Sequence, residues 1–171
     1  MYVIAGIVLL IVILALIAPK SYNVSRSIEI NKSAKDLFEY LRFIKNHDNW
    51  SPWFERDPNM KKTYTGTDGE AGFVSAWESD HKQVGSGEQE IMSLVDSEVI
   101  NSELRFLKPF KSTSDAYLKL NEGNNGTKVT WGFSGNNKFP VSIMMLFMNM
   151  DKAVGKDFEA GLAKLKEILE K

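Results

Sequence analysis

The sequence predicts an α+β domain built from a seven-stranded, curved antiparallel sheet, two short helices and a long C-terminal helix, preceded by one transmembrane helix. Three observations lead to this prediction. Residues 2–18 contain no charged side chain, seven later stretches have strand character between turn sequences, and residues 141–171 repeat apolar side chains at helical spacing. The 171 residues have room for one domain and an appendage, predicted at residues 20–171 and 1–19.

Residues 2–18, YVIAGIVLLIVILALIA, predict a helix that anchors the chain in a membrane. At about 1.5 Å per residue they extend roughly 26 Å, at the short end of what a bilayer requires. A cleaved signal peptide is the alternative, but it needs a basic start and a small-residue cleavage site, both missing here. The basic residues that follow the span favour a cytoplasmic domain by the positive-inside rule. We therefore expect a single-pass membrane protein with a cytoplasmic soluble domain.

The first strand and the two short helices follow this segment directly. Residues 22–30 predict the strand, because every second position from Tyr22 to Ile30 is apolar except Arg26, and the positions between them are polar. Ser33 is a suitable N-cap for a helix, and Asp36 occupies the capping-box position three residues later. The segment HDNWSPWFERDP then predicts a second short helix or turn, interrupted by Pro52 and Pro58.

Six strands and one long helix complete the predicted domain. Turn sequences such as Asp68-Gly69 and Lys108-Pro109 separate strands predicted at residues 61–67, 72–79, 83–94, 98–107, 111–121 and 126–134. Such short links favour an antiparallel meander. Residues 141–171 predict one continuous helix, and it is the only element long enough to cover one face of the sheet. A curved sheet and a straight helix cannot meet everywhere, so we expect a cavity between them.

Six local sequences carry a family resemblance. They read YNVSRSIEIN, NWSPWFERDP, GSGEQEI, FLKPFKS, GTKVTWGFSG and FPVSIMMLFMNMDKAVGKDFEAGLAKLK. In this order they resemble the START-like or SRPBCC superfamily, and within it the polyketide cyclase/dehydrase and lipid transport group, in a bacterial branch with an N-terminal membrane span. The resemblance covers residues 22–170 and implies the helix-grip fold. It leaves the function open, because the superfamily includes lipid carriers, hormone receptors and cyclases.

Strand parity and the start of the last helix together predict the side chains that line a ligand cavity. The predicted set is Trp53, Phe73, Trp77, Phe106, Leu118, Trp131, Phe133, Met144, Phe147 and Met148. Such a lining suits an apolar ligand with one or two polar groups, while ordinary core packing is the alternative for each residue. Arg26 shares a face with Val24 and Ile28, so it is a possible polar cavity group, unless it pairs with a nearby acid. The parity of the strand around Glu88 and Glu90 stays open.

The stretch SIMMLFMNM, residues 142–150, is apolar around most of the predicted helix. Nine residues are too few for a second membrane span. Methionine adapts its shape to different partners, so we expect this stretch to form the lid end of the helix over the cavity mouth.

Composition excludes several other functions. The 21 basic and 22 acidic residues leave no basic excess for a nucleic acid. The chain has no cysteine, and its two histidines, His47 and His81, lack partners at metal spacing and are expected at the surface. We expect no metal or cofactor. A membrane-anchored binder of a hydrophobic small molecule or lipid is the main hypothesis, and a polyketide cyclase, aromatase or dehydratase is the alternative, although no convergent catalytic set is visible. A partner protein that docks on the outer face ranks last.

Overall fold

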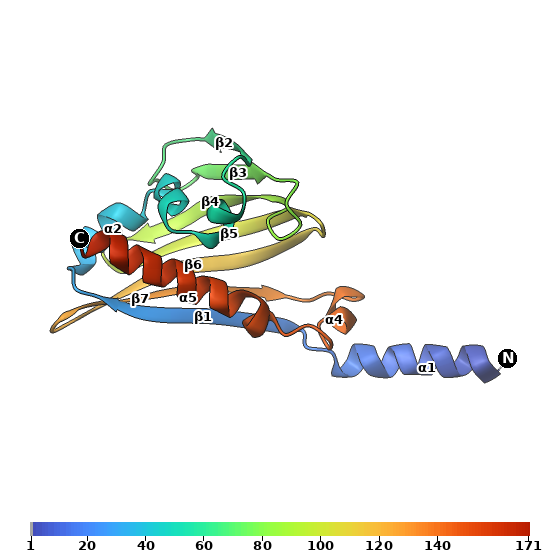
Figure 1. The fold of residues 1–171 in the computed structure, drawn as a ribbon. Helices are drawn as coiled ribbons and strands as arrows, with labels where there is room; N and C mark the ends of the chain where they lie inside the picture. Colours follow the sequence, from blue (N-terminus) through green and yellow to red (C-terminus); the bar gives the residue numbers. More distant parts are fainter. Residues whose placement is uncertain (1) are drawn as a thin grey trace.

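A computed structural model describes residues 2–171 (Figure 1). The chain begins with helix α1 (Tyr2–Ile17), strand β1 (Ser21–Ile30), helix α2 (Ala34–Leu41), the 3-10 helix η1 (Ile44–Asn49) and helix α3 (Pro52–Arg56). Six strands follow: β2 (Lys61–Thr65), β3 (Val74–Glu78), β4 (Ser86–Val95), β5 (Val99–Lys108), β6 (Ser112–Gly123) and β7 (Gly126–Asn136). Helices α4 (Val141–Met144) and α5 (Met150–Leu169) end the chain.

The seven strands form one antiparallel sheet in the order β1-β7-β6-β5-β4-β3-β2. Each strand from β2 to β6 pairs with the strand that follows it in the sequence, because short turns join them. Strand β1 lies at one edge and pairs with β7, the last strand. The predicted seven-stranded antiparallel sheet is therefore confirmed.

The register of β4 against β5 settles the parity that the sequence left open. Glu88 lies opposite Arg105 and pairs with it at 2.5 Å, on the outer face. Gln89 points to the inner face, where its side chain donates a hydrogen bond to the buried Ser102. Along β4 and β5, the inner face is therefore lined by apolar and small polar side chains, and the outer face carries the charges.

Helix α5 lies over β1 and β7 on the inner face (Figure 1). Its buried Phe158 stacks on Trp131, with ring centroids 4.4 Å apart, and meets Phe133 and Trp53 edge-on. Gly161 allows the helix to approach closely, since a Cβ atom there would lie 2.8 Å from the Trp131 ring. Packed aromatic rings therefore fill the space beneath this part of the helix.

The predicted continuous helix over residues 141–171 is interrupted. Helix α4 ends at Met144, and α5 begins only at Met150. The Asn149 side chain caps α5 by accepting a hydrogen bond from the Lys152 backbone N–H at 3.0 Å, with Asn149 itself in an extended conformation. An N-cap of this kind starts a new helix, so the stretch SIMMLFMNM is mostly a connection between two helices.

Helix α1 corrects the prediction for the N-terminal segment. It has 16 residues, buries none of them and projects away from the sheet (Figure 1). At about 1.5 Å per residue it is shorter than the roughly 30 Å hydrocarbon layer of a bilayer. None of the helices within residues 2–171 has the length and apolarity to cross a membrane. The predicted transmembrane helix at residues 2–18 and the single-pass membrane localisation are therefore wrong, and the predicted membrane partner has no support from the structure.

Candidate ligand-binding site

A cavity of about 400 Å³ lies between the start of β1 and the connection from α4 to α5. Its walls are residues 19 and 21–24, Asn137 after the end of β7, and residues 145–151. Because β1 pairs with β7 while α5 crosses β1, these three segments meet at one end of the domain. The volume is within the range of small-molecule sites, roughly 300–1,000 Å³.

One wall of the cavity is almost entirely apolar. From the end of α4 to the first residue of α5, it consists of Met145, Leu146, Phe147, Met148 and Met150, with Asn149 as the one polar member. Phe147 and Met148 are 83% and 48% exposed, so much of this surface contacts solvent. Flexible, polarisable methionine side chains can repack around ligands of different shape.

The opposite wall presents polar groups that already have partners. The Tyr22 hydroxyl shares a hydrogen bond of 2.6 Å with Ser114. Gly135 makes room for the tyrosine, since a Cβ atom there would lie 2.4 Å from the hydroxyl oxygen. Asn137 donates its side-chain N–H to the Pro19 carbonyl at 3.2 Å. These contacts hold the start of β1 against β6 and β7 and fix this wall.

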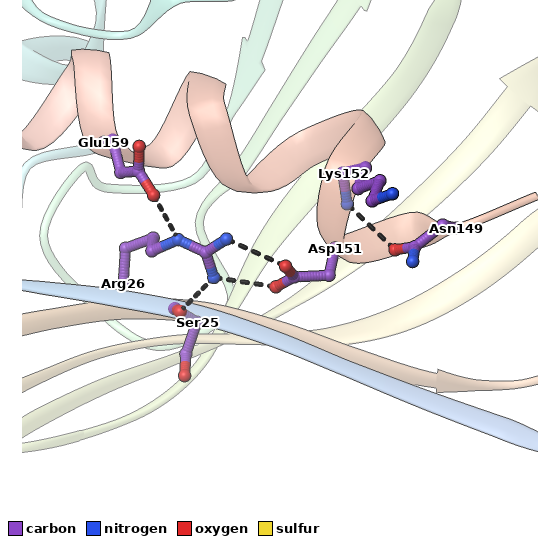
Figure 2. Close-up of polar contacts among 6 residues, drawn as sticks. All are labelled: Ser25, Arg26, Asn149, Asp151, Lys152 and Glu159. Atoms are coloured by element: carbon purple, nitrogen blue, oxygen red, sulfur yellow. Dashed lines mark hydrogen bonds and ion pairs between the residues drawn. The ribbon is translucent and has the colours of Figure 1, made fainter.

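Arg26 links β1 to the first turns of α5, beside the cavity (Figure 2). Its guanidinium donates two hydrogen bonds to the Asp151 carboxylate, at 2.7 and 3.0 Å, and one to Glu159 at 2.5 Å. It also donates to the Ser25 carbonyl at 2.8 Å. A Cβ atom at Gly155 would lie 2.2 Å from this guanidinium, so only glycine leaves space for it against the helix.

The electrostatics of this group keep Arg26 and Asp151 charged. The hydrogen bonds that Arg26 donates to Asp151 and Glu159 raise the pKa of Arg26, and those donated to Asp151 lower the pKa of that carboxylate. Asp151 lines the cavity, whereas Arg26 does not. The structure thus shows the pairing with nearby acids that the sequence left as the alternative for Arg26.

The sequence pattern of the family described as "Polyketide cyclase / dehydrase and lipid transport" matches residues 21–170. The chain belongs to this family. No functionally curated protein matches the chain.

Several solved structures share the fold of this protein. Protein MLL2253 from Mesorhizobium loti has a TM-score of 0.62 and 14% identity, over 87% of this chain and 97% of that chain. Ginseng major latex-like protein 151 from Panax ginseng has a TM-score of 0.61 and 10% identity, over 88% and 98%. The di-domain ARO/CYC BexL from the BE-7585A biosynthetic pathway has a TM-score of 0.60 and 15% identity, over 91% of this chain and 52% of that chain. At such low identity, the likeness shows the helix-grip fold alone.

The ten side chains that the sequence predicted to line a cavity lie in different parts of the structure. Phe147 and Met148 line the cavity described above, while Met144 lies in α4, outside its lining. Leu118, Trp131 and Phe133 belong to the main core, and the partly buried Trp53 packs against it.

The other three lie toward the far strands of the sheet. Phe73 is buried in a separate cluster with Ile44 and Ile91. Trp77 and Phe106 are partly exposed and meet edge-on on the inner face, with ring centroids 6.2 Å apart.

Sequence reasoning missed several groups at the site. The start of β1 was predicted as a strand but not as part of a cavity, and Asn137 follows the predicted end of the last strand. Asp151 had a usable signal, since an acidic residue two positions after an N-cap asparagine is typical of a first helical turn.

His47 corrects a second prediction from the sequence. It was expected at the surface, but it is only 6% exposed, with its ring centroid 4.7 Å from that of Trp50. Burial lowers the pKa of His47 to about 4, so the ring is neutral at physiological pH. It does not line the cavity, and residues 2–171 contain no cluster of side chains suited to a metal ion.

Proposed function

We propose that residues 20–171 bind a hydrophobic small molecule or lipid in the cavity between β1 and the α4–α5 connection. The observation that carries the proposal is the apolar wall of residues 145–150, which exposes methionine and phenylalanine side chains around about 400 Å³. Exposed apolar surface is unfavourable in water, and a bound apolar molecule would remove it from solvent. Membership of a family that includes lipid transport in its description supports the same function.

An enzyme of cyclase, aromatase or dehydratase type is the second candidate. The likeness to the ARO/CYC BexL favours it at the level of fold. General acid–base catalysis needs a group whose pKa lies near the working pH. Of the titratable side chains that line the cavity, Asp151 has a lowered pKa, and both of its oxygens already accept hydrogen bonds from Arg26. Tyr22 shares its hydroxyl with Ser114. These pairings favour a binding protein.

Ligand binding can be tested on the full chain with a neutral fluorescent probe, N-phenyl-1-naphthylamine. We expect saturable binding by the wild type, and an apolar mass released from gently purified protein in native mass spectrometry. Met148→Gln should weaken probe binding, because this side chain lines the cavity. Met92→Gln is the matched control, since Met92 is similarly exposed (52% against 48%) but lies on β4, outside the lining.

Two results would contradict the proposal. One is protein without any bound apolar mass that also fails to bind the probe. The other is equal weakening by Met148→Gln and Met92→Gln, which would mean that the probe does not occupy this cavity. Conversion of a poly-ketone substrate by the wild type, lost in Asp151→Asn, would favour the enzyme instead.

A further inference from the structure

We infer that the ligand of this cavity carries no negative charge, and that it is an uncharged apolar molecule with a hydroxyl or carbonyl oxygen. This inference rests on the proposed function and names the ligand class. It follows from the charges along the cavity wall, the use of the nearby arginine and the amide N–H groups of Asn149, which are unoccupied in the described part of the chain.

The cavity wall contains a single charged side chain, and that charge is negative. Asp151 is the only aspartate, glutamate, lysine or arginine among the lining residues 19, 21–24, 137 and 145–151. Lys20, Lys138 and Lys152 are adjacent to them in sequence, but these lysines are exposed and do not line the cavity. A ligand carboxylate or phosphate would therefore lose water on entry without gaining a cationic partner, which is unfavourable.

Arg26 does not offset this negative charge. Its Nε, Nη1 and Nη2 all donate to protein oxygens, and two of its acceptors are carboxylates, on Asp151 and Glu159 (Figure 2). One positive and two negative side chains leave the group with a net charge of −1. An anionic ligand would have to displace Asp151 from a bidentate contact, which fork geometry makes one of the stronger ion pairs.

Asn149 is a lining side chain that can recognise an uncharged oxygen. Its Oδ1 accepts the Lys152 backbone N–H as the N-cap of α5, and this contact fixes the orientation of the amide. Nδ2 therefore keeps two N–H donors for a ligand, and within residues 2–171 no hydrogen bond occupies them. A hydroxyl or carbonyl oxygen is a suitable acceptor for them, with no charge to desolvate.

The test compares two ligands with the same chain, decanol and decanoate, at about pH 8, where decanoate is ionised. Each compound is titrated against the 171-residue chain with bound N-phenyl-1-naphthylamine, and displacement of this probe measures its affinity. We expect the wild type to bind decanol at least about tenfold more tightly than decanoate. Asp151→Asn should reduce this preference, because it removes the negative charge from the wall and frees Arg26 from its bidentate contact. Glu167→Gln is the control, since it removes one negative charge from the same helix at an exposed position whose salt bridge is with Lys171. This variant should keep the wild-type preference for decanol over decanoate.

Each outcome decides for or against the inference. Decanoate that binds the wild type as tightly as decanol overturns it and leaves the proposed function standing. A preference that Asp151→Asn does not change also overturns it, because the wall charge then does not set selectivity. If neither compound nor the probe binds the wild type, the proposed function fails and the inference fails with it. The wild-type comparison decides alone if circular dichroism shows that Asp151→Asn is unfolded.

Discussion

Replacing Phe147 with aspartate should separate ligand affinity from the stability of the domain. Phe147 is 83% exposed, so only about 17% of its surface is covered by the protein. An aromatic side chain offers roughly 200 Å², so about 35 Å² is buried. At about 25 cal/mol per Å² this burial contributes at most about 1 kcal/mol to the free energy of unfolding. For a domain of this size the melting temperature should fall by no more than about 4 °C.

The effect on ligand binding should be larger. Phe147 forms part of the apolar wall, and the substitution places a second carboxylate close to Asp151. We expect the affinity for N-phenyl-1-naphthylamine or decanol to fall at least about tenfold, which corresponds to about 1.4 kcal/mol. Fluorescence titration gives the affinity, and urea denaturation gives the free energy of unfolding.

Phe110→Asp is the matched control for this experiment. Phe110 is 66% exposed in the turn between β5 and β6, outside the cavity lining, so the variant should keep wild-type affinity. A stability loss well above 2 kcal/mol in Phe147→Asp would refute the reasoning, because the side chain would then be part of the core. Unchanged affinity would show that residues 145–150 do not contact the ligand.

Three further predictions concern the groups that hold the site in place. Phe158→Ala should lower the free energy of unfolding by about 3–5 kcal/mol in urea denaturation, because it removes a buried ring packed on three aromatic side chains. Burial lowers the pKa of His47 from 6.5 to about 4. Between these two pH values the histidine is protonated in the unfolded chain but neutral in the folded chain. Its stabilising contribution is complete above about pH 6.5 and is lost as the pH falls toward 4, by roughly 3 kcal/mol in all, and His47→Gln should remove this part of the pH dependence. Gly155→Ala should displace the Arg26 guanidinium and speed hydrogen exchange in the first turns of α5, with little effect on exchange in β4 and β5.

Each of these predictions has a clear contrary result. A loss below about 1 kcal/mol in Phe158→Ala would mean that the aromatic cluster does not support α5. Identical pH profiles for the wild type and His47→Gln would show that the histidine is solvated in the folded protein. Unchanged exchange at the start of α5 in Gly155→Ala would mean that Arg26 does not hold this helix end.

Local sequence was sufficient to predict the sheet. Alternation in strands such as β1, β6 and β7 placed Val24, Leu118 and Trp131 on one face, and these three residues are buried. The bulges in β4 blurred its parity, because an inserted residue shifts every later side chain to the other face. Only the pairing with Arg105 on β5 settles the orientation of its two glutamates, and cross-strand pairing is not visible in one segment alone.

The position of the cavity could not be predicted in the same way. Parity identifies an inner face, but it does not say how closely a helix approaches it. Two glycines decide this distance here: Gly161 lets Trp131 fill the space under the middle of α5, and Gly155 admits the Arg26 guanidinium near its start. The one local signal for the break before α5 was Asn149, an N-cap residue inside a run of apolar side chains that otherwise continued the helical pattern. The ligand-contacting roles of the predicted cavity residues remain predictions.

The pairing of β1 with β7 also sets the order in which the chain can fold. Ser27 on β1 and Thr130 on β7 share a hydrogen bond although they are 103 positions apart. During synthesis, β1 therefore leaves the ribosome long before either β7 or α5 exists to cover it. Contacts between such distant residues are slow to form, because a long loop must close first. A nascent chain that stops before residue 126 has an unpaired β1 and lacks the apolar wall of residues 145–150, so the ligand site is among the last parts of the molecule to form.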